Sequence, residues 1–167
     1  WRVVMEALRW HRLSGGAFDP TIGPIKRLFR FDQIEVEAWP SEADIAATRD
    51  LVGADKVLYR REGMQLALER SGMRLDLGGI AKGFACDYAA EELSRRGVVN
   101  AMIEIGGELR LMGMKPENPP RPWKTGVRDP RGDGIVAALD LADAAVATSG
   151  DYENYFMYRG KRYEHII

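Results

Sequence analysis

The segment with the clearest chemical potential runs from Asp76 to Asp87, DLGGIAKGFACD. Gly78 and Gly79 allow the backbone to turn tightly and another group to approach it. The periodic apolar residues that follow predict a helix over residues 81–96. Free N–H groups at the start of this helix, with the charge of Lys82, favour a phosphate or diphosphate. The spacing matches neither the Walker motif nor the dinucleotide fingerprint. The alternative is therefore a strand-to-helix turn with a surface lysine.

A second candidate segment covers residues 15–31, GGAFDPTIGPIKRLFRF. Its density of glycine and proline predicts a shaped loop without regular secondary structure. Phe18 offers a planar apolar surface, and Asp19 and Thr21 offer hydrogen-bonding groups. A ligand-binding role competes here with an Asx-type turn, in which Asp19 serves only its own backbone and Phe18 belongs to the core.

Two further places carry groups that could take part in chemistry. Gly106 and Gly107 interrupt extended sequence between Glu104 and Glu108, which predicts either a binding site or an edge bulge with solvated carboxylates. His165 lies in an expected strand. Histidine transfers protons near neutral pH, so it is either a base or a strand residue with a satisfied hydrogen bond.

Composition limits the classes of function. The chain has 167 residues, 46% of them hydrophobic and 29% charged, which is typical of a globular domain. A net charge of −1 gives no electrostatic reason to expect nucleic acid or an anionic membrane as partner. The single cysteine, Cys86, excludes an intrachain disulfide framework and a cysteine-rich metal site, and we expect it to be a small buried thiol.

The pattern of expected elements indicates the fold class. Helices are expected over residues 1–13, 41–51 and 81–96. Strands are expected over residues 56–60, 64–69, 74–77, 98–105, 109–112, 123–127, 135–141, 144–148, 155–158 and 162–167. Strands outnumber helices and several form sequential hairpins, which predicts an α+β fold with a largely antiparallel sheet. Because the chain opens inside an expected helix and closes inside an expected strand, we expect residues 1–167 to be a single, partial domain that lacks both ends.

The ordered motifs together resemble one known family. GGAFDPTIGPI, DLGGIAKGFACD, IEIGGELRLMG, TSGDYENYF and RYEHII are similar, in this order, to motifs of the ApbE-like flavin transferases. The resemblance implies a T-fold-like sheet-and-helix sandwich. It also implies binding of FAD and Mg²⁺, and transfer of FMN from FAD to a Thr or Ser hydroxyl of a target flavoprotein subunit, with release of AMP. The implied location is the bacterial cell envelope, periplasmic or as an inner-membrane lipoprotein whose anchor lies outside this chain, with the cytoplasm as the alternative.

The resemblance also assigns roles to single residues. The implied FAD contacts are Ala17, Phe18, Asp19, Asp76, Lys82 and Ile166. Ala81 would offer its backbone carbonyl to magnesium, with Gly79 as the alternative. His165 would activate the acceptor hydroxyl. The side-chain magnesium ligands of the family fall beyond Ile167, so the segment itself is expected to bind magnesium poorly and to be inactive.

Three other functions remain open at this point. An FAD diphosphatase would use the same site with water as the acceptor, giving FMN and AMP. A non-catalytic protein would bind FAD without turning it over. A generic nucleotide-binding domain would show no preference for FAD over ATP.

Overall fold

The computed structural model describes residues 1–31, 35–150 and 155–166. The chain divides into two compact units, and each is described by itself. The first contains residues 1–79 and 151–167, and the second residues 80–150. The expectation of a single domain therefore stays a prediction.

In the first unit, helix α1 (Arg2–Leu13) packs against the hairpin of β1 (Val57–Arg60) and β2 (Gln65–Leu68). Two 3₁₀ turns, η1 (Ala54–Lys56) and η2 (Glu62–Met64), precede and connect these strands. The strands are antiparallel, with Val57 opposite Leu68. The core comprises Val4, Met5, Leu8, Ala54, Val57, Leu68 and Leu75.

The same unit also contains helix α2 (Gly23–Leu28), helix α3 (Glu42–Arg49) and the hairpin of β8 (Tyr155–Tyr158) and β9 (Lys161–Glu164). Aromatic rings join the segment that follows α2 to the hairpin, with the Phe31 and Phe156 centroids 5.2 Å apart. Ser41 caps α3, because its hydroxyl accepts the Asp44 N–H at 3.1 Å.

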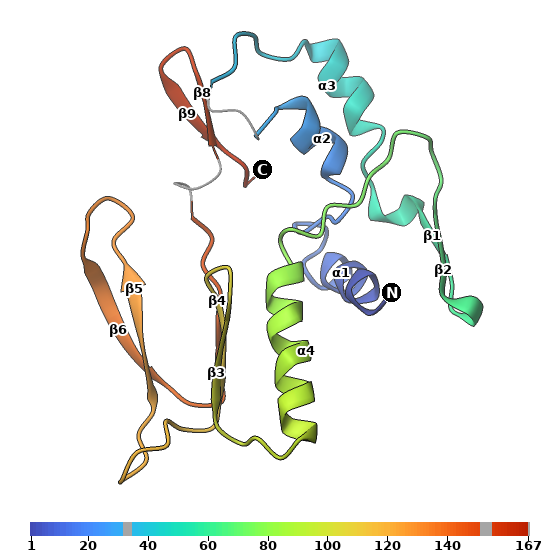
Figure 1. Cartoon of the computed structure of the whole chain (residues 1–167). Helices are drawn as coiled ribbons and strands as arrows, with labels where there is room; N and C mark the ends of the chain where they lie inside the picture. The colour runs from blue at the N-terminus through green and yellow to red at the C-terminus, as the bar shows by residue number, and fades with distance from the viewer. Residues whose placement is uncertain (32–34, 151–154, 167) are drawn as a thin grey trace. The chain divides into compact units, whose positions relative to one another are not determined.

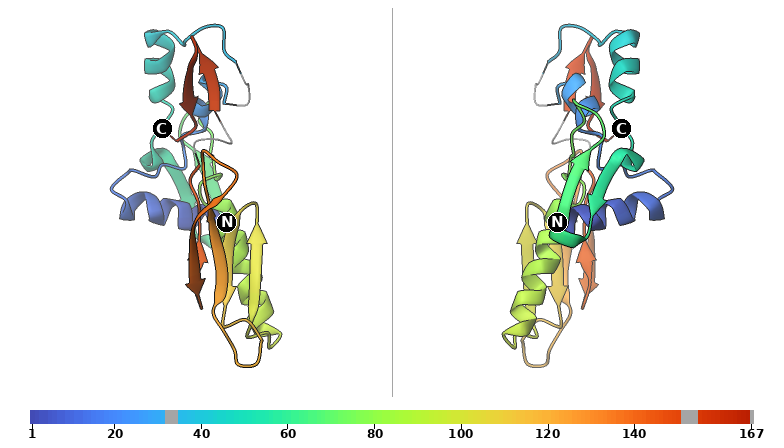
Figure 2. Two further views of the ribbon diagram at one scale, coloured as in Figure 1. Left: turned by 90° about the vertical axis from the view of Figure 1, so that its left-hand side faces the viewer. Right: turned by 90° about the vertical axis from the view of Figure 1, so that its right-hand side faces the viewer.

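In the second unit, helix α4 (Ala81–Arg95) packs along β3 (Ala101–Ile105) and β4 (Glu108–Met112), as Figures 1 and 2 show. β7 (Ala145–Val146) extends this sheet antiparallel to β4. A separate antiparallel ribbon consists of β5 (Trp123–Arg128) and β6 (Ile135–Leu141). Cys86 is buried on the inner side of α4, as expected.

The predicted α+β class with antiparallel pairing is confirmed, since every pair of named strands in the described residues is antiparallel. No described helix combines the length and the apolar character that crossing a membrane requires.

Several local predictions were wrong. Residues 15–31 are not all loop, because α2 begins at Gly23 with Pro24 in its first turn, where proline's missing N–H costs nothing. Residues 74–77 form no strand, and β3 begins at Ala101 instead of at residue 98. Part of the TSGDYENYF motif, residues 151–154, lies outside the described residues.

Two errors concern candidate site residues. Gly106 and Gly107 do not form a bulge; they are the two-residue turn of the β3–β4 hairpin, with φ of 57° and 88°, and Ile105 pairs with Glu108. His165 does not lie in a strand, because β9 ends at Glu164. It follows the strand in a bend.

Leu111 tests the packing of the second unit. Its side chain is fully buried in β4, so Leu111→Ala leaves a cavity and should lower the free energy of unfolding by about 2 to 5 kcal/mol. Val136→Ala in β6 is the control, since Val136 is 61% exposed and should change stability by less than about 0.5 kcal/mol. Urea unfolding measures both variants. Equal losses would contradict the placement of Leu111 in the core.

Candidate functional site

The loop of residues 17–20, here called the FDP loop, is held by a buried threonine. Thr21 is fully buried, and both its N–H and its hydroxyl donate to Oδ1 of Asp19, at 2.7 and 2.6 Å. The same hydroxyl oxygen accepts the N–H of Gly53 at 2.7 Å. The Asx-type turn considered from the sequence is therefore present. The second carboxylate oxygen of Asp19 takes no part in it.

His11, at the end of α1, supports the FDP loop from the other side. Its Nδ1 lies 2.9 Å from the carbonyl oxygen of Phe18 and 3.7 Å from Oδ2 of Asp19. The hydroxyl of Ser14 accepts the N–H of Phe18 at 3.0 Å. The loop thus has a defined shape, set by residues before and after it in the chain.

The FDP loop lies directly beside the glycine loop, residues 76–79. The N–H of Asp76 donates to the carbonyl of Pro20 at 2.7 Å. A Cβ atom on Gly79 would lie only 3.0 Å from Cε2 of Phe18, so the aromatic ring rests against the glycine backbone. Three residues that the resemblance assigns to FAD, Phe18, Asp19 and Asp76, are therefore on adjoining loops of one unit.

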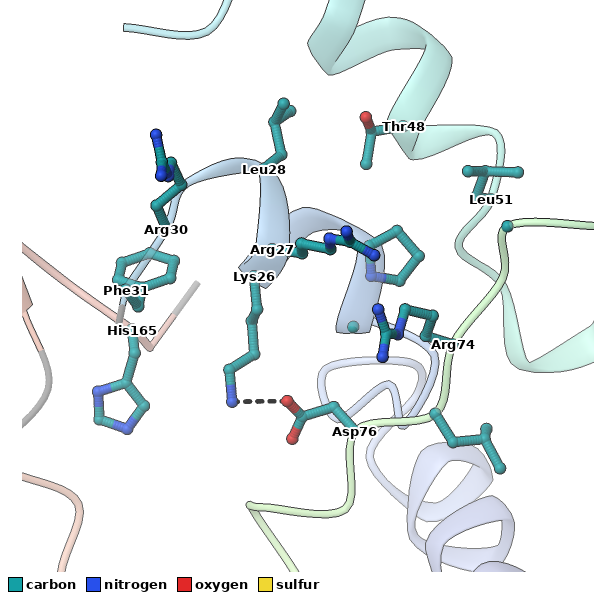
Figure 3. A pocket seen from close by; sticks show the side chains of 14 residues that line it. Lys26, Arg27, Leu28, Arg30, Phe31, Thr48, Leu51, Arg74, Asp76 and His165 are labelled. Atoms are coloured by element: carbon teal, nitrogen blue, oxygen red, sulfur yellow. Dashed lines mark ion pairs between the residues drawn. The ribbon is translucent and has the colours of Figure 1, made fainter. Parts of the chain in front are cut away.

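A close backbone approach brings Asp76 to a lysine that the sequence analysis did not single out. A Cβ on Gly23 would lie 2.9 Å from Cβ of Arg74, so only glycine lets α2 approach residues 74–76 this closely. Lys26, one turn along α2, then reaches Asp76 with 2.8 Å between Nζ and Oδ2 (Figure 3). The other oxygen of Asp76 accepts the N–H of Gly78 at 2.9 Å.

These contacts set the protonation of Asp76. Burial raises the pKa of its carboxyl, but the hydrogen bonds from Lys26 and Gly78 and the electrostatic influence of Lys26 and His165 lower the pKa by more. The net result is a pKa below the ordinary 3.8. Asp76 is therefore a carboxylate at neutral pH.

A cavity of about 1110 Å³, here called the α2 cavity, opens beside this ion pair (Figure 3). Asp76 and His165 line it, together with residues of α2 and α3. Its cationic side chains are Lys26, Arg27, Arg30 and Arg74. Ala17, Phe18, Asp19 and Ile166 are not among its lining residues. Ala17 and Ile166 are exposed.

Lys82 lies in the second unit, in the first turn of α4. Its Nζ donates to the carbonyl of Gly106 at 2.9 Å and lies 3.1 Å from Oε1 of Glu108. Glu108 is mostly buried, and its Oε2 has no hydrogen-bond partner in the described residues. No side chain among the described residues caps α4, so N–H groups of its first turn remain available to a ligand. Lys82 is thus held at the hairpin turn with its side chain 45% exposed.

The implied magnesium contacts, Gly79 and Ala81, lie at or just before the start of α4. Magnesium requires several oxygen ligands in octahedral geometry, and no group of three or more His, Cys, Asp or Glu side chains suited to a metal occurs in the described part of the chain. Ala81 begins α4, where its carbonyl points along the helix toward the N–H four residues on. Gly79 precedes the helix and has no such constraint, so it is the better candidate of the two.

The comparisons with known proteins bear on these motifs. The sequence profile of the ApbE family matches residues 1–167. The chain belongs to the ApbE family. A Vibrio cholerae protein named FAD:protein FMN transferase is 37% identical over 168 residues, covering 99% of this chain and 49% of that protein. A Haemophilus influenzae protein of the same name is 35% identical, covering 99% of this chain and 49% of that protein.

Solved structures agree with the sequence comparisons. The crystal structure of the ApbE protein from Thermotoga maritima superposes with a TM-score of 0.86 at 38% identity, covering 99% of this chain and 53% of that one. Pseudomonas stutzeri flavinyl transferase ApbE, in its apo form, gives a TM-score of 0.80 at 35% identity, with 98% and 50% covered. This chain therefore spans about half the length of the relatives that it matches.

Replacement of Lys26 tests the electrostatics around Asp76. Lys26→Met removes both a hydrogen bond and a charge that lower the pKa of Asp76, so this pKa should rise. Because the folded pKa lies below the unfolded one, ionised Asp76 contributes stability that is lost as pH falls through the folded pKa, and the loss should start at higher pH in the variant. Carbon-13 NMR titration of the Asp76 carboxyl measures the shift.

Lys56→Met is the matched control, because the Lys56 ammonium donates to the carbonyls of Asp50 and Val52 instead of to a carboxylate. It should leave the titration of Asp76 unchanged. An unchanged pKa in Lys26→Met would show that the ion pair with Asp76 is absent in solution.

Proposed function

We propose that the protein containing this chain is an FAD:protein FMN transferase. The observation that carries the proposal is the match of the whole chain to relatives of that name, at 37% and 35% identity. The structure adds support, since the FDP loop and the glycine loop, which carry the implied flavin contacts, are joined by the hydrogen bond from Asp76 to Pro20.

In the proposed reaction, a Thr or Ser hydroxyl of a target protein attacks the FMN-side phosphorus of FAD. The P–O bond to the AMP-side phosphate breaks, FMN becomes esterified to the target, and AMP leaves. His165 would accept the hydroxyl proton and later release it to solvent. Lys82 would stabilise negative charge on the diphosphate. Ala17, Phe18, Asp19, Asp76 and Ile166 would bind the flavin nucleotide.

Magnesium dependence is part of the proposal by family resemblance alone. A backbone carbonyl at Gly79 or Ala81 would supply one ligand, and the resemblance implies side-chain ligands beyond Ile167. The proposed targets are flavoprotein subunits, and the proposed location is the bacterial cell envelope.

Mass spectrometry of an acceptor tests the transferase. The full-length gene product is incubated with FAD, magnesium and a Thr-containing peptide, and covalently attached FMN is expected, with loss of attachment in EDTA. His165→Ala should lower kcat by about 10²- to 10⁴-fold, the usual contribution of a general base. Release of free FMN and AMP in place of peptide labelling would indicate an FAD diphosphatase. FAD binding without any turnover would indicate a non-catalytic protein.

The role of Lys82 has its own test. Lys82→Met should weaken FAD binding by roughly 10-fold or more, because a hydrogen bond to a charged group contributes about 1.5 to 3 kcal/mol. Flavin fluorescence measures the Kd. Lys124→Met is the matched control, since the Lys124 side chain is 72% exposed and pairs with Asp140 on the β5–β6 ribbon. Equal Kd values for the two variants would remove Lys82 from the proposed site.

A further inference from the structure

Glu108, the first residue of β4, carries a carboxylate that lies mostly away from water. Its side chain is only 14% exposed, and its Oε2 is buried with no hydrogen-bond partner in the described residues. The other oxygen, Oε1, lies 3.1 Å from Nζ of Lys82. The sequence also allowed solvated carboxylates beside this turn, and Glu108 is not one of them.

Contacts of the main chain hold Glu108 in place. It pairs with Ile105 across the β3–β4 hairpin. From α4, the thiol of Cys86, which is 2% exposed, donates to the carbonyl of Glu108 at 3.5 Å. Cys86 follows Lys82 by four residues, so both side chains leave the same face of α4. The carboxylate therefore reaches Lys82 from a fixed backbone.

The free energy of folding does not explain this ion pair. Removing a carboxylate from water is costly, and a well-packed hydrocarbon side chain of similar volume often stabilises a protein as well or better at such a position. A buried oxygen without a partner adds to the cost. The useful consequence of the contact therefore lies at Lys82, whose side chain is 45% exposed and open to a ligand.

The contact limits where the ammonium group of Lys82 can lie. That group has three N–H donors, of which the Gly106 carbonyl at 2.9 Å and Glu108 take two, leaving one for a ligand. The side chain also lies close against the hairpin turn, since a Cβ on Gly106 would be 3.0 Å from Cδ of Lys82. A free lysine side chain loses many rotamers on binding, whereas one that is already held loses fewer.

We propose that Glu108 is a positioning residue, whose carboxylate holds Lys82 so that its remaining N–H is directed at the diphosphate of FAD. This inference rests on the proposed function, because it takes Lys82 as a group that binds the diphosphate. Glu108 acts through Lys82 and is not itself a contact of FAD, since a carboxylate repels phosphate. Its hydrogen bond orients Lys82, while its negative charge weakens the attraction of Lys82 for the ligand.

Two substitutions in the full-length protein separate these opposing effects. Glu108→Gln keeps the shape and an oxygen that accepts the Lys82 N–H, but removes the charge. Glu108→Leu keeps a similar volume and removes both. Flavin fluorescence should give a Kd for FAD that is lower or within about twofold in Glu108→Gln. The Kd should be raised roughly fivefold in Glu108→Leu, as expected for one long side chain that must be immobilised on binding.

A double-mutant cycle shows whether Glu108 acts through Lys82. In the Lys82→Met protein, Glu108→Leu should change the Kd by less than about twofold, because no ammonium group remains to be positioned. A merely structural role of Glu108 would persist in that background. Glu92→Leu is the matched control, since Glu92 is 39% exposed on α4 and pairs with Arg95 of the same helix. It should leave the Kd unchanged, and the Tm checks the fold of each variant.

NMR relaxation tests the positioning of Lys82 without FAD. Lysines are labelled with carbon-13, and the Lys82→Met variant assigns the signal. The order parameter of Lys82 Cε should fall in Glu108→Leu and stay unchanged in Glu108→Gln.

Three outcomes would overturn the inference: an unchanged order parameter in Glu108→Leu, tighter FAD binding by both Glu108 variants, or an equal loss of binding with and without Lys82. A protein in which Glu108 orders Lys82 but which binds no FAD would contradict the proposed function and leave the positioning role in place.

Discussion

The candidate site in the first unit depends on one backbone hydrogen bond, from the N–H of Asp76 to the carbonyl of Pro20 at 2.7 Å. It joins two loops that are far apart in the sequence. Backbone N–H and C=O groups that are buried between loops need hydrogen-bond partners, because an unpaired group costs as much free energy as a lost hydrogen bond. Once this bond forms, the Phe18 ring rests on Gly79 and the Asp76 carboxylate faces α2. The relative positions of the implied flavin contacts in this unit follow from it.

The polar groups around this bond form hydrogen bonds within the chain, and these bonds hold the two loops in shape before a ligand binds. Thr21 has no exposed surface, and its hydroxyl both donates to Asp19 and accepts from Gly53. Asp76 divides its two oxygens between the Gly78 N–H and Lys26. A preformed site loses less conformational entropy on binding than a flexible one. The arginines of the α2 cavity are the exception, since they form no such bonds within the described residues.

Lys82, in the second unit, is likewise held in place by contacts within the chain. Its ammonium group is held by a carbonyl at the Gly106–Gly107 turn and by Glu108. The hairpin turn and the first turn of α4 thus support each other. A lysine fixed in this way keeps its charge in a defined place, although Glu108 also neutralises part of its field.

The sequence alone was enough to predict the α+β class, helices α1, α3 and α4, and the motifs that identify the family. These features depend on local periodicity, on turn residues and on the order of short motifs, all of which can be seen along the chain. Prediction from local sequence failed where the same residue type is compatible with two different structures. It missed α2 because glycine and proline usually break helices but also begin them, and it read the turn at Gly106 as a bulge.

Which groups meet follows from the three-dimensional packing and not from any local pattern. The pairing of Lys26 with Asp76 requires the close approach at Gly23, and the α2 cavity requires α2, α3 and His165 to face one space. Such contacts join residues separated by long stretches of chain, and no pattern of spacing encodes them. They arise when burial and hydrogen bonding select one packing of the elements, so the charge of the cavity is a property of the fold and not of any motif.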